Sequence, residues 1–196
     1  MTSEPPSTRP HEGVCGDADH QQHLALEIVV EDGGWADETT LQSQLAEVVR
    51  AMGRDPSLPK ASCEAVVVFT TDAAVRTLNR TWRGKDKPTN VLSFPAGEAG
   101  SPPGQARFLG DIVLAGETTR READEQGIPV DHHLKHLVLH GLLHLMGYDH
   151  ETEDEALVME ELETRILSGL GISDPHSGVI DAAVVGGTGR NGADSA

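Results

Sequence analysis

The segment from Asp131 to about Met146 constrains the fold most, because its apolar residues leave it almost no polar face. At the 3.6-residue period of a helix, the leucines, valine and methionine between positions 137 and 146 point to nearly every side. A helix of this kind must be buried by other elements. At 196 residues and 20.9 kDa, the chain is long enough for one domain with an apolar core that encloses it.

The middle of the chain alternates strand and helix patterns around this segment. Runs rich in β-branched and aromatic residues predict strands at 26–30, 64–70, 90–94 and 108–114. Helical periodicity predicts helices at 37–52, 72–81, 117–126 and 153–167, in addition to 131–146. The interleaved order, with helices accumulating towards the C-terminus, predicts a single-domain α+β layer fold: one mixed, four-stranded sheet with about five helices. Strand order does not follow from the pattern.

The two ends differ in composition from this domain, which we place at residues 24–172. Residues 1–23 are rich in Pro, Ser, Glu and Asp, and residues 173–196 in Gly, Ser and Asp, which predicts two disordered tails. Apolar residues between positions 179 and 185 leave room for a short docked segment. No run approaches about 18 uninterrupted apolar residues, and two cysteines are too few for a disulfide framework. We therefore expect a soluble, cytoplasmic protein.

The formal net charge of −17 repels phosphate polyanions, so any binding of nucleic acid must rest on a local basic surface. One basic segment carries five cations against a single carboxylate, Asp86: Arg76, Arg80, Arg83, Lys85 and Lys87. These are candidate RNA-binding residues, and Arg83 is able to hold a phosphate through two nitrogens. The alternative is a solvated surface that balances nearby carboxylates. We expect Trp82 to anchor the core, and the Glu-rich runs 117–125 and 151–163 to form solvated helix faces.

Three histidines occur at the end of the apolar helix with metal-ligand spacing. His140 and His144 are four residues apart, so they lie one turn apart on the same helix face. Gly147 stands where a left-handed residue would end the helix, and the reversed chain then returns His150 towards the pair. This arrangement predicts three neutral imidazoles around one ion, with a fourth position left for water. Helical spacing also permits a pair from His136 and His140, or histidines that are simply hydrogen-bonded in the core.

A site with three histidines leaves the charge of the ion unneutralised, so bound water reaches a pKa of about 7 and is suited to hydrolysis. Zinc is the expected ion because imidazole suits it, although nickel, copper and iron take the same ligands. Asp149 is a candidate for orienting a ligand ring through its second nitrogen. His136 has either that role or a structural one, because the helix twist carries it away from the side of His144 and His150.

The spacing of His140, His144 and His150, with a glycine between the last two, matches the metzincin proteases. Those enzymes carry Glu directly after the first histidine as the general base, whereas this chain has Gly141. Peptide hydrolysis therefore loses its main support. It stays an alternative, as does a binding module whose zinc ion is purely structural.

Three blocks of sequence carry a resemblance to a known family. They are LNRTWRGKDKPTNVLSFP at 78–95, LGDI at 109–112 and HGLLHLMGYDH at 140–150. In this order they closely resemble the bacterial YbeY endoribonucleases, and the resemblance runs from about Leu24 to Ile172. Trp82 stands where that family usually has Tyr.

The resemblance implies a metal-dependent endoribonuclease that is specific for single-stranded RNA. It implies maturation of ribosomal RNA, notably the 3′ end of the small-subunit (16S) RNA, and ribosome quality control. The implied partners are ribosomal RNA and the small ribosomal subunit with its proteins, without membrane or DNA, and the implied cofactor is one zinc ion. The zinc ligands of the family correspond to His140, His144 and His150, and its functionally important arginine to Arg83. His140 and Arg83 are therefore the candidate catalytic residues.

Overall fold

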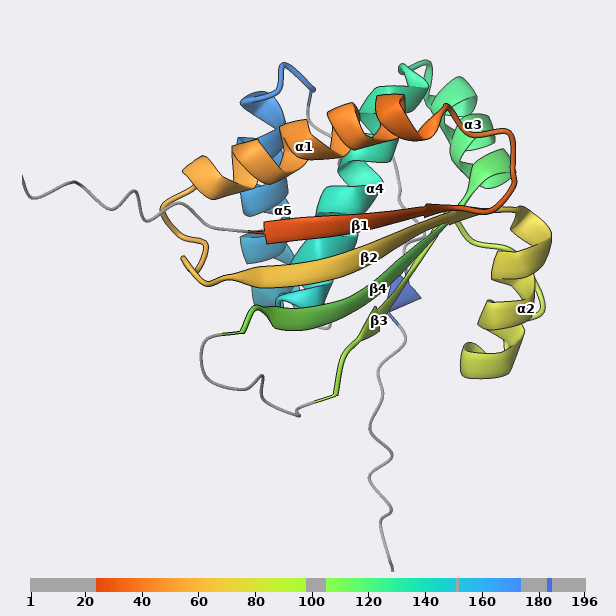
Figure 1. Ribbon diagram of the computed structural model, residues 1–196, viewed down its shortest axis with the longest axis horizontal. Helices are drawn as coiled ribbons and strands as arrows, with labels where there is room; N and C mark the ends of the chain where they lie inside the picture. The colour runs from red at the N-terminus through yellow and green to blue at the C-terminus, as the bar shows by residue number, and fades with distance from the viewer. Residues whose placement is uncertain (1–23, 98–104, 151, 174–182, 185–196) are drawn as a thin grey trace, which may run out of the picture.

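The apolar segment forms helix α4, Val130–Leu145, at the centre of the domain (Figure 1). Every residue from His133 to Leu145 is buried, including the charged Lys135. The computed structural model describes residues 24–97, 105–150, 152–173 and 183–184. Within this part of the chain, neither α4 nor any other helix is long and apolar enough to span a bilayer. The core is therefore built around α4, as its lack of a polar face predicts.

A mixed sheet carries the helices. Its strands are β1 (Leu24–Val30), β2 (Cys63–Thr70), β3 (Val91–Pro95), β4 (Arg107–Ala115) and β5 (Ala183–Val184). They lie in the order β1-β2-β4-β3-β5, and all neighbours are parallel except β3 and β4. The four longer strands and the mixed α+β class are confirmed predictions. The two-residue β5 extends the sheet from the segment predicted as a C-terminal tail; the tail residues 1–23, 174–182 and 185–196 lie outside the described residues.

The helices divide between the two faces of the sheet. Besides α4 they are α1 (Glu38–Arg54), α2 (Asp72–Arg83), α3 (Gly116–Gln126) and α5 (Glu153–Ser168). Helices α1, α4 and α5 lie along one face, whereas α2 stands apart from them (Figure 1). The alternation of strand side chains produces this division, because Val91 of β3 belongs to the core with α4 and the next residue, Leu92, packs with Val75 of α2.

Capping residues fix where the helices begin and end. The Thr71 hydroxyl accepts a hydrogen bond from the Ala74 N–H at the start of α2. Thr152 and Glu155 form a capping box at the start of α5, directly after the histidine segment. Both helices start at the predicted residues, Asp72 and Glu153.

An ion pair joins α5 to the end of α1. Arg165 Nε donates to Asp55 Oδ2 at 2.7 Å, and the Asp55 side chain is only 5% exposed. The hydrogen bond from Arg165 lowers the pKa of Asp55 to about 2. This contact matters for the site below, because α5 supplies a residue to it.

Candidate metal centre

Three histidine rings from two segments meet at the C-terminal end of α4. The Nε2 atoms of His140 and His144 are 3.0 Å apart. The ring centroid of His150 lies 5.8 Å from that of His140 and 5.0 Å from that of His144. One nitrogen from each ring lies within 4.8 Å of the other two. The three nitrogens are therefore close enough to bind one ion.

The chain reverses at Gly147. This residue has a φ of 96°, a conformation that glycine adopts without strain. The Gly147 N–H bonds to the carbonyl of His144, and the Tyr148 N–H to the carbonyl of Leu143, both at 3.0 Å. These are the two hydrogen bonds of a Schellman motif, which closes a helix and turns the chain. The glycine stop predicted from the sequence is confirmed, and it returns His150 to the helical pair.

The outer nitrogens of the pair have fixed partners. His144 Nδ1 lies 3.0 Å from the carbonyl oxygen of Tyr148, and His140 Nδ1 lies 2.7 Å from Oε1 of Glu163 on α5. A carbonyl and a carboxylate both accept hydrogen bonds, so each Nδ1 carries the hydrogen and each Nε2 a lone pair. The tautomers of both rings are thereby set.

Two Nε2 lone pairs that face each other across 3.0 Å repel unless a cation lies between them. Two nitrogens bound to one zinc ion in tetrahedral geometry are about 3.3 Å apart, close to this separation. Burial, and then the neighbouring rings of His140 and His150, lower the pKa of His144 to about 4. The ring is neutral at neutral pH, which is the form that binds metal. The residues present therefore fit a divalent ion with a preference for nitrogen.

Gly141 brings α4 close to the sheet. A Cβ atom at this position would lie 3.0 Å from Cδ1 of Ile112 and 3.1 Å from Oγ of Ser93. Position 141 therefore faces strands β3 and β4. A glutamate there would point into the packed sheet, so the arrangement disfavours the protease mechanism for a reason beyond the missing carboxylate.

His136 and Asp149, the two residues predicted as candidates to orient the ligand rings, have different contacts. His136 Nε2 lies 3.6 Å from Oε2 of Glu163, so its contact is with the carboxylate that holds His140. The Asp149 carboxylate accepts from the backbone N–H of His150 at 2.8 Å. Among the described residues, no hydrogen bond joins Asp149 to a histidine ring. The Nδ1 atoms of His140 and His144 contact Glu163 and the Tyr148 carbonyl instead.

Sequence reasoning missed Glu163, because it placed the run 151–163 on a solvated helix face. That expectation was wrong at this residue, which is 1% exposed. The signal was present in the sequence: Glu163 shares the buried side of its helix with Met159, Leu162 and Ile166. A carboxylate within an apolar stripe needs a buried partner, and His140 provides it.

The basic segment lies on α2 and the turn that follows it. Arg76 donates to both oxygens of Asp86 at 2.8 and 2.9 Å, and Arg80 Nη1 lies 3.7 Å from the same carboxylate. Arg83 is half-buried, and Lys85 and Lys87 are exposed. In the described part of the chain, no hydrogen bond or ion pair joins Arg83 to the three histidines.

The expectation that Trp82 anchors the core was wrong. Its side chain is 62% exposed, and its ring meets that of Phe94 edge-on at 6.1 Å. Trp82 lies in the last turn of α2, about two turns after the buried Val75. An exposed aromatic ring therefore lies beside the arginines of α2.

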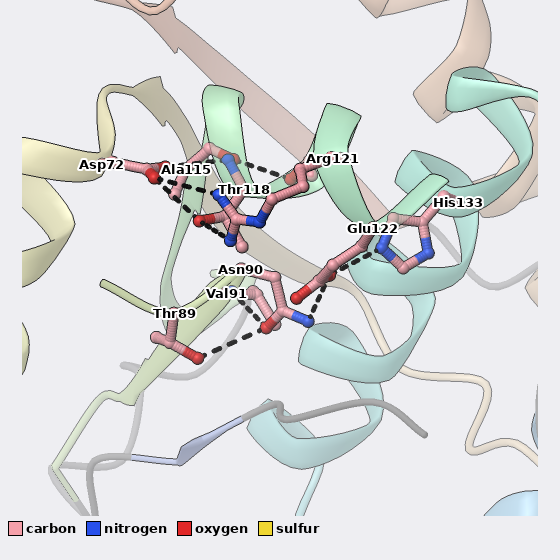
Figure 2. A network of polar contacts seen from close by, with 10 residues as sticks. Asp72, Thr89, Asn90, Val91, Ala115, Thr118, Arg121, Glu122 and His133 are labelled. Carbon is pink, nitrogen blue, oxygen red and sulfur yellow. Dashed lines mark hydrogen bonds and ion pairs between the residues drawn. The ribbon is translucent and has the colours of Figure 1, made fainter. Parts of the chain in front are cut away.

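A polar network fixes both ends of the basic segment (Figure 2). At its start, the Asp72 carboxylate accepts from the backbone N–H and the hydroxyl of Thr118 at 2.9 and 2.8 Å. At its end, Asn90 Nδ2 donates to Glu122 at 2.9 Å, and Glu122 also contacts His133 Nε2 at 2.9 Å. The network ties the segment to α3 and to α4, the helix that carries two of the three histidines. Glu122 is a second exception to the expected solvated acidic faces.

Fold and site together define a class: an α+β protein with three imidazoles brought together at the end of a buried helix, an arrangement that metal-dependent hydrolases use. Residues 29–171 match the family model described as Endoribonuclease YbeY. The chain therefore belongs to the YbeY family.

Relatives named Endoribonuclease YbeY cover most of the chain. One from Rhodopseudomonas palustris (strain BisA53) is 50% identical over 155 residues, which is 78% of this chain and 90% of the relative. One from Bradyrhizobium diazoefficiens is 51% identical over 164 residues, or 81% and 88%. The solution structure of TM1509 from Thermotoga maritima matches with a TM-score of 0.50 at 22% identity, covering 79% of this chain and 96% of that one. This last similarity concerns the fold.

Proposed function

We propose that this chain is a metal-dependent endoribonuclease that cleaves single-stranded RNA. The observation that carries the proposal is the set of three histidine nitrogens within 4.8 Å of one another, two of them only 3.0 Å apart. The names of the relatives support RNA as the substrate. Its natural substrate in this proposal is the 3′ end of the small-subunit (16S) ribosomal RNA. Its partner is the small ribosomal subunit in the cytoplasm, where it contributes to ribosome quality control.

The metal in this proposal is zinc, held by His140, His144 and His150. All three are imidazoles, which zinc accepts readily, and no carboxylate of the cluster neutralises its charge. When bound, the ion supplies Lewis acidity towards a phosphoryl oxygen or a water molecule. The histidines hold their ring nitrogens in place, and Gly147 supplies the bend that brings His150 to the pair.

Arg83 and the basic segment bind the RNA backbone in this proposal. With a net charge of −17, the chain depends on local cations to attract phosphate. Asp86 neutralises only part of the charge of Arg76 and Arg80, and Arg83, Lys85 and Lys87 add three further cations. The guanidinium of Arg83 binds a phosphate and stabilises the negative charge that builds on it during cleavage.

The test is cleavage of a labelled single-stranded RNA, with the same sequence in duplex form and casein as comparison substrates. We expect cleavage of the single strand alone, loss of cleavage on removal of metal, and its return with zinc. The variant His144→Ala should lose activity, and Arg83→Ala should lower kcat about 10²- to 10³-fold. The controls are His132→Ala and Arg50→Ala. They change the same residue types at positions outside the three-histidine site. Cleavage that persists in both test variants would reject the assignment.

The two alternatives give different outcomes. A protease would hydrolyse casein, which Gly141 argues against. A binding module with a structural zinc would lose its fold with the metal in the variant His150→Ala, which changes an exposed histidine, whereas our proposal expects loss of activity with the fold kept. Circular dichroism of that variant separates the two.

A further inference from the structure

The His140 nitrogen that points away from the other two histidines contacts a carboxylate that the proposed function leaves unassigned. Glu163 Oε1 lies 2.7 Å from His140 Nδ1, and Glu163 Oε2 lies 3.6 Å from His136 Nε2. Glu163 is 1% exposed, and it comes from α5, 23 residues beyond His140. One nitrogen or oxygen atom from each of these three residues lies within 4.8 Å of the other two, so the group has to be weighed as a second metal site.

The separation between His140 and Glu163 identifies a hydrogen bond and not a second metal site. Two ligands of one tetrahedral ion have donor atoms about 3.3 Å apart. A charge-assisted N–H···O hydrogen bond has a length of about 2.7 to 2.9 Å, which the observed 2.7 Å matches. His140 Nδ1 therefore donates to Glu163, which leaves the lone pair on Nε2, the atom 3.0 Å from His144 Nε2.

We propose that Glu163 is a positioning residue that sets the tautomer of His140 and aims its Nε2 lone pair at the shared metal position. By accepting the Nδ1 hydrogen bond, the carboxylate also raises the electron density of the ring, which makes Nε2 a stronger ligand. This inference rests on the proposed function, in that it assumes a metal bound by the three histidines.

The surroundings hold Glu163 in place for this role. Helix α5 is capped at its start by Thr152 and tied to α1 by the ion pair of Arg165 with Asp55. On either side of Glu163, Leu162 and Ile166 are buried in the core, so its side chain is directed towards α4. A long, solvated carboxylate would sample many orientations, whereas this one keeps His140 in a single orientation.

The test measures metal affinity without RNA, by competition between the metal-free protein and a zinc chelator. Glu163→Gln keeps the size and an acceptor oxygen but removes the charge, and Glu163→Leu removes both. Glu161→Gln is the matched control, because it makes the same charge change at an exposed position of the same helix. We expect about 10-fold weaker zinc binding for the glutamine variant and about 100-fold for the leucine variant, with the control unchanged.

A purely structural role would lower the free energy of unfolding and leave zinc affinity of the folded protein unchanged. Nitrogen NMR of the metal-free protein gives a second measurement: His140 should carry its proton on Nδ1 in the wild type and shift towards Nε2 in Glu163→Leu. If the leucine variant does not fold, the glutamine variant alone decides.

Equal zinc affinity in wild type and Glu163→Gln, with an unchanged His140 tautomer, would overturn the inference and leave the ribonuclease proposal intact. The converse outcome is that the variants bind zinc more weakly by the expected factors while the wild type cleaves no RNA. That result would overturn the proposed function and support the role of Glu163.

Discussion

Replacing Gly147 with alanine separates backbone strain from the loss of a metal ligand. The residue has a φ of 96°, and a Cβ there would meet nothing within 4 Å, so the substitution creates no steric clash. An L-residue in left-handed conformation costs about 1 to 2 kcal/mol. If the bend were kept, metal-free protein would lose this much stability. The chain also has a second response, which is to relax the bend and move His150 away from the pair.

We expect relaxation, because the strain at position 147 acts directly on the two backbone hydrogen bonds that close the bend. Zinc affinity should then fall about 10-fold or more, and each factor of ten removes about 1.4 kcal/mol of zinc-dependent stabilisation. Gly127→Ala is the control, because Gly127 ends α3 with a φ of 66° and also has nothing within 4 Å. It imposes the same kind of strain away from the histidines.

The assay is urea unfolding of wild type, Gly147→Ala and Gly127→Ala, each with and without a fixed excess of zinc. The difference between the two conditions should be equal for wild type and Gly127→Ala, and smaller for Gly147→Ala. An equal increment in all three proteins would refute the claim that the glycine bend brings a metal ligand into place.

Three further substitutions test other parts of the structure. Because Arg165 lowers the pKa of Asp55 to about 2, this pair stabilises the fold above the unfolded pKa of about 4, and the stabilisation is lost as pH falls towards 2. Arg165 is 53% exposed, so solvent weakens the pair. In urea unfolding, the wild type should therefore lose about 1 kcal/mol more of its unfolding free energy over this pH range than Arg165→Gln does. Gly141→Glu should lower the free energy of unfolding by about 2 kcal/mol or more and produce no casein hydrolysis, since the side chain meets Ile112 and Ser93; gained proteolysis would contradict the geometry. Trp82→Ala should change the unfolding free energy by less than about 1 kcal/mol, because the ring is 62% exposed, and a larger loss would restore its predicted role in the core.

The sequence predicts most of the elements because local rules determine them. Helix α4 has no polar face, so its burial follows from composition alone, and Gly147 ends it where a left-handed residue is needed. The four longer strands match the runs of β-branched and aromatic residues. Strand order is different in kind, because the insertion of β4 between β2 and β3 depends on pairing between distant segments.

The limits of sequence reasoning at the site have the same origin. His140, His144 and His150 are local in sequence, and one turn type relates them. Glu163 reaches His140 only because α5 packs against α4. The periodicity of a helix predicts which of its sides is buried, but not which other helix that side contacts. Trp82 was misjudged because a helical stripe predicts which side faces the sheet but not how far the sheet covers each residue on that side.

Zinc-edge X-ray absorption of the zinc-loaded protein tests the central claim most directly. The account predicts one zinc per chain, three imidazole nitrogens at about 2.0 to 2.1 Å and a solvent oxygen in the remaining position. In His150→Ala, the number of imidazole ligands should fall to two. A fourth protein ligand in wild type, or an unchanged zinc environment in His150→Ala, would contradict the account.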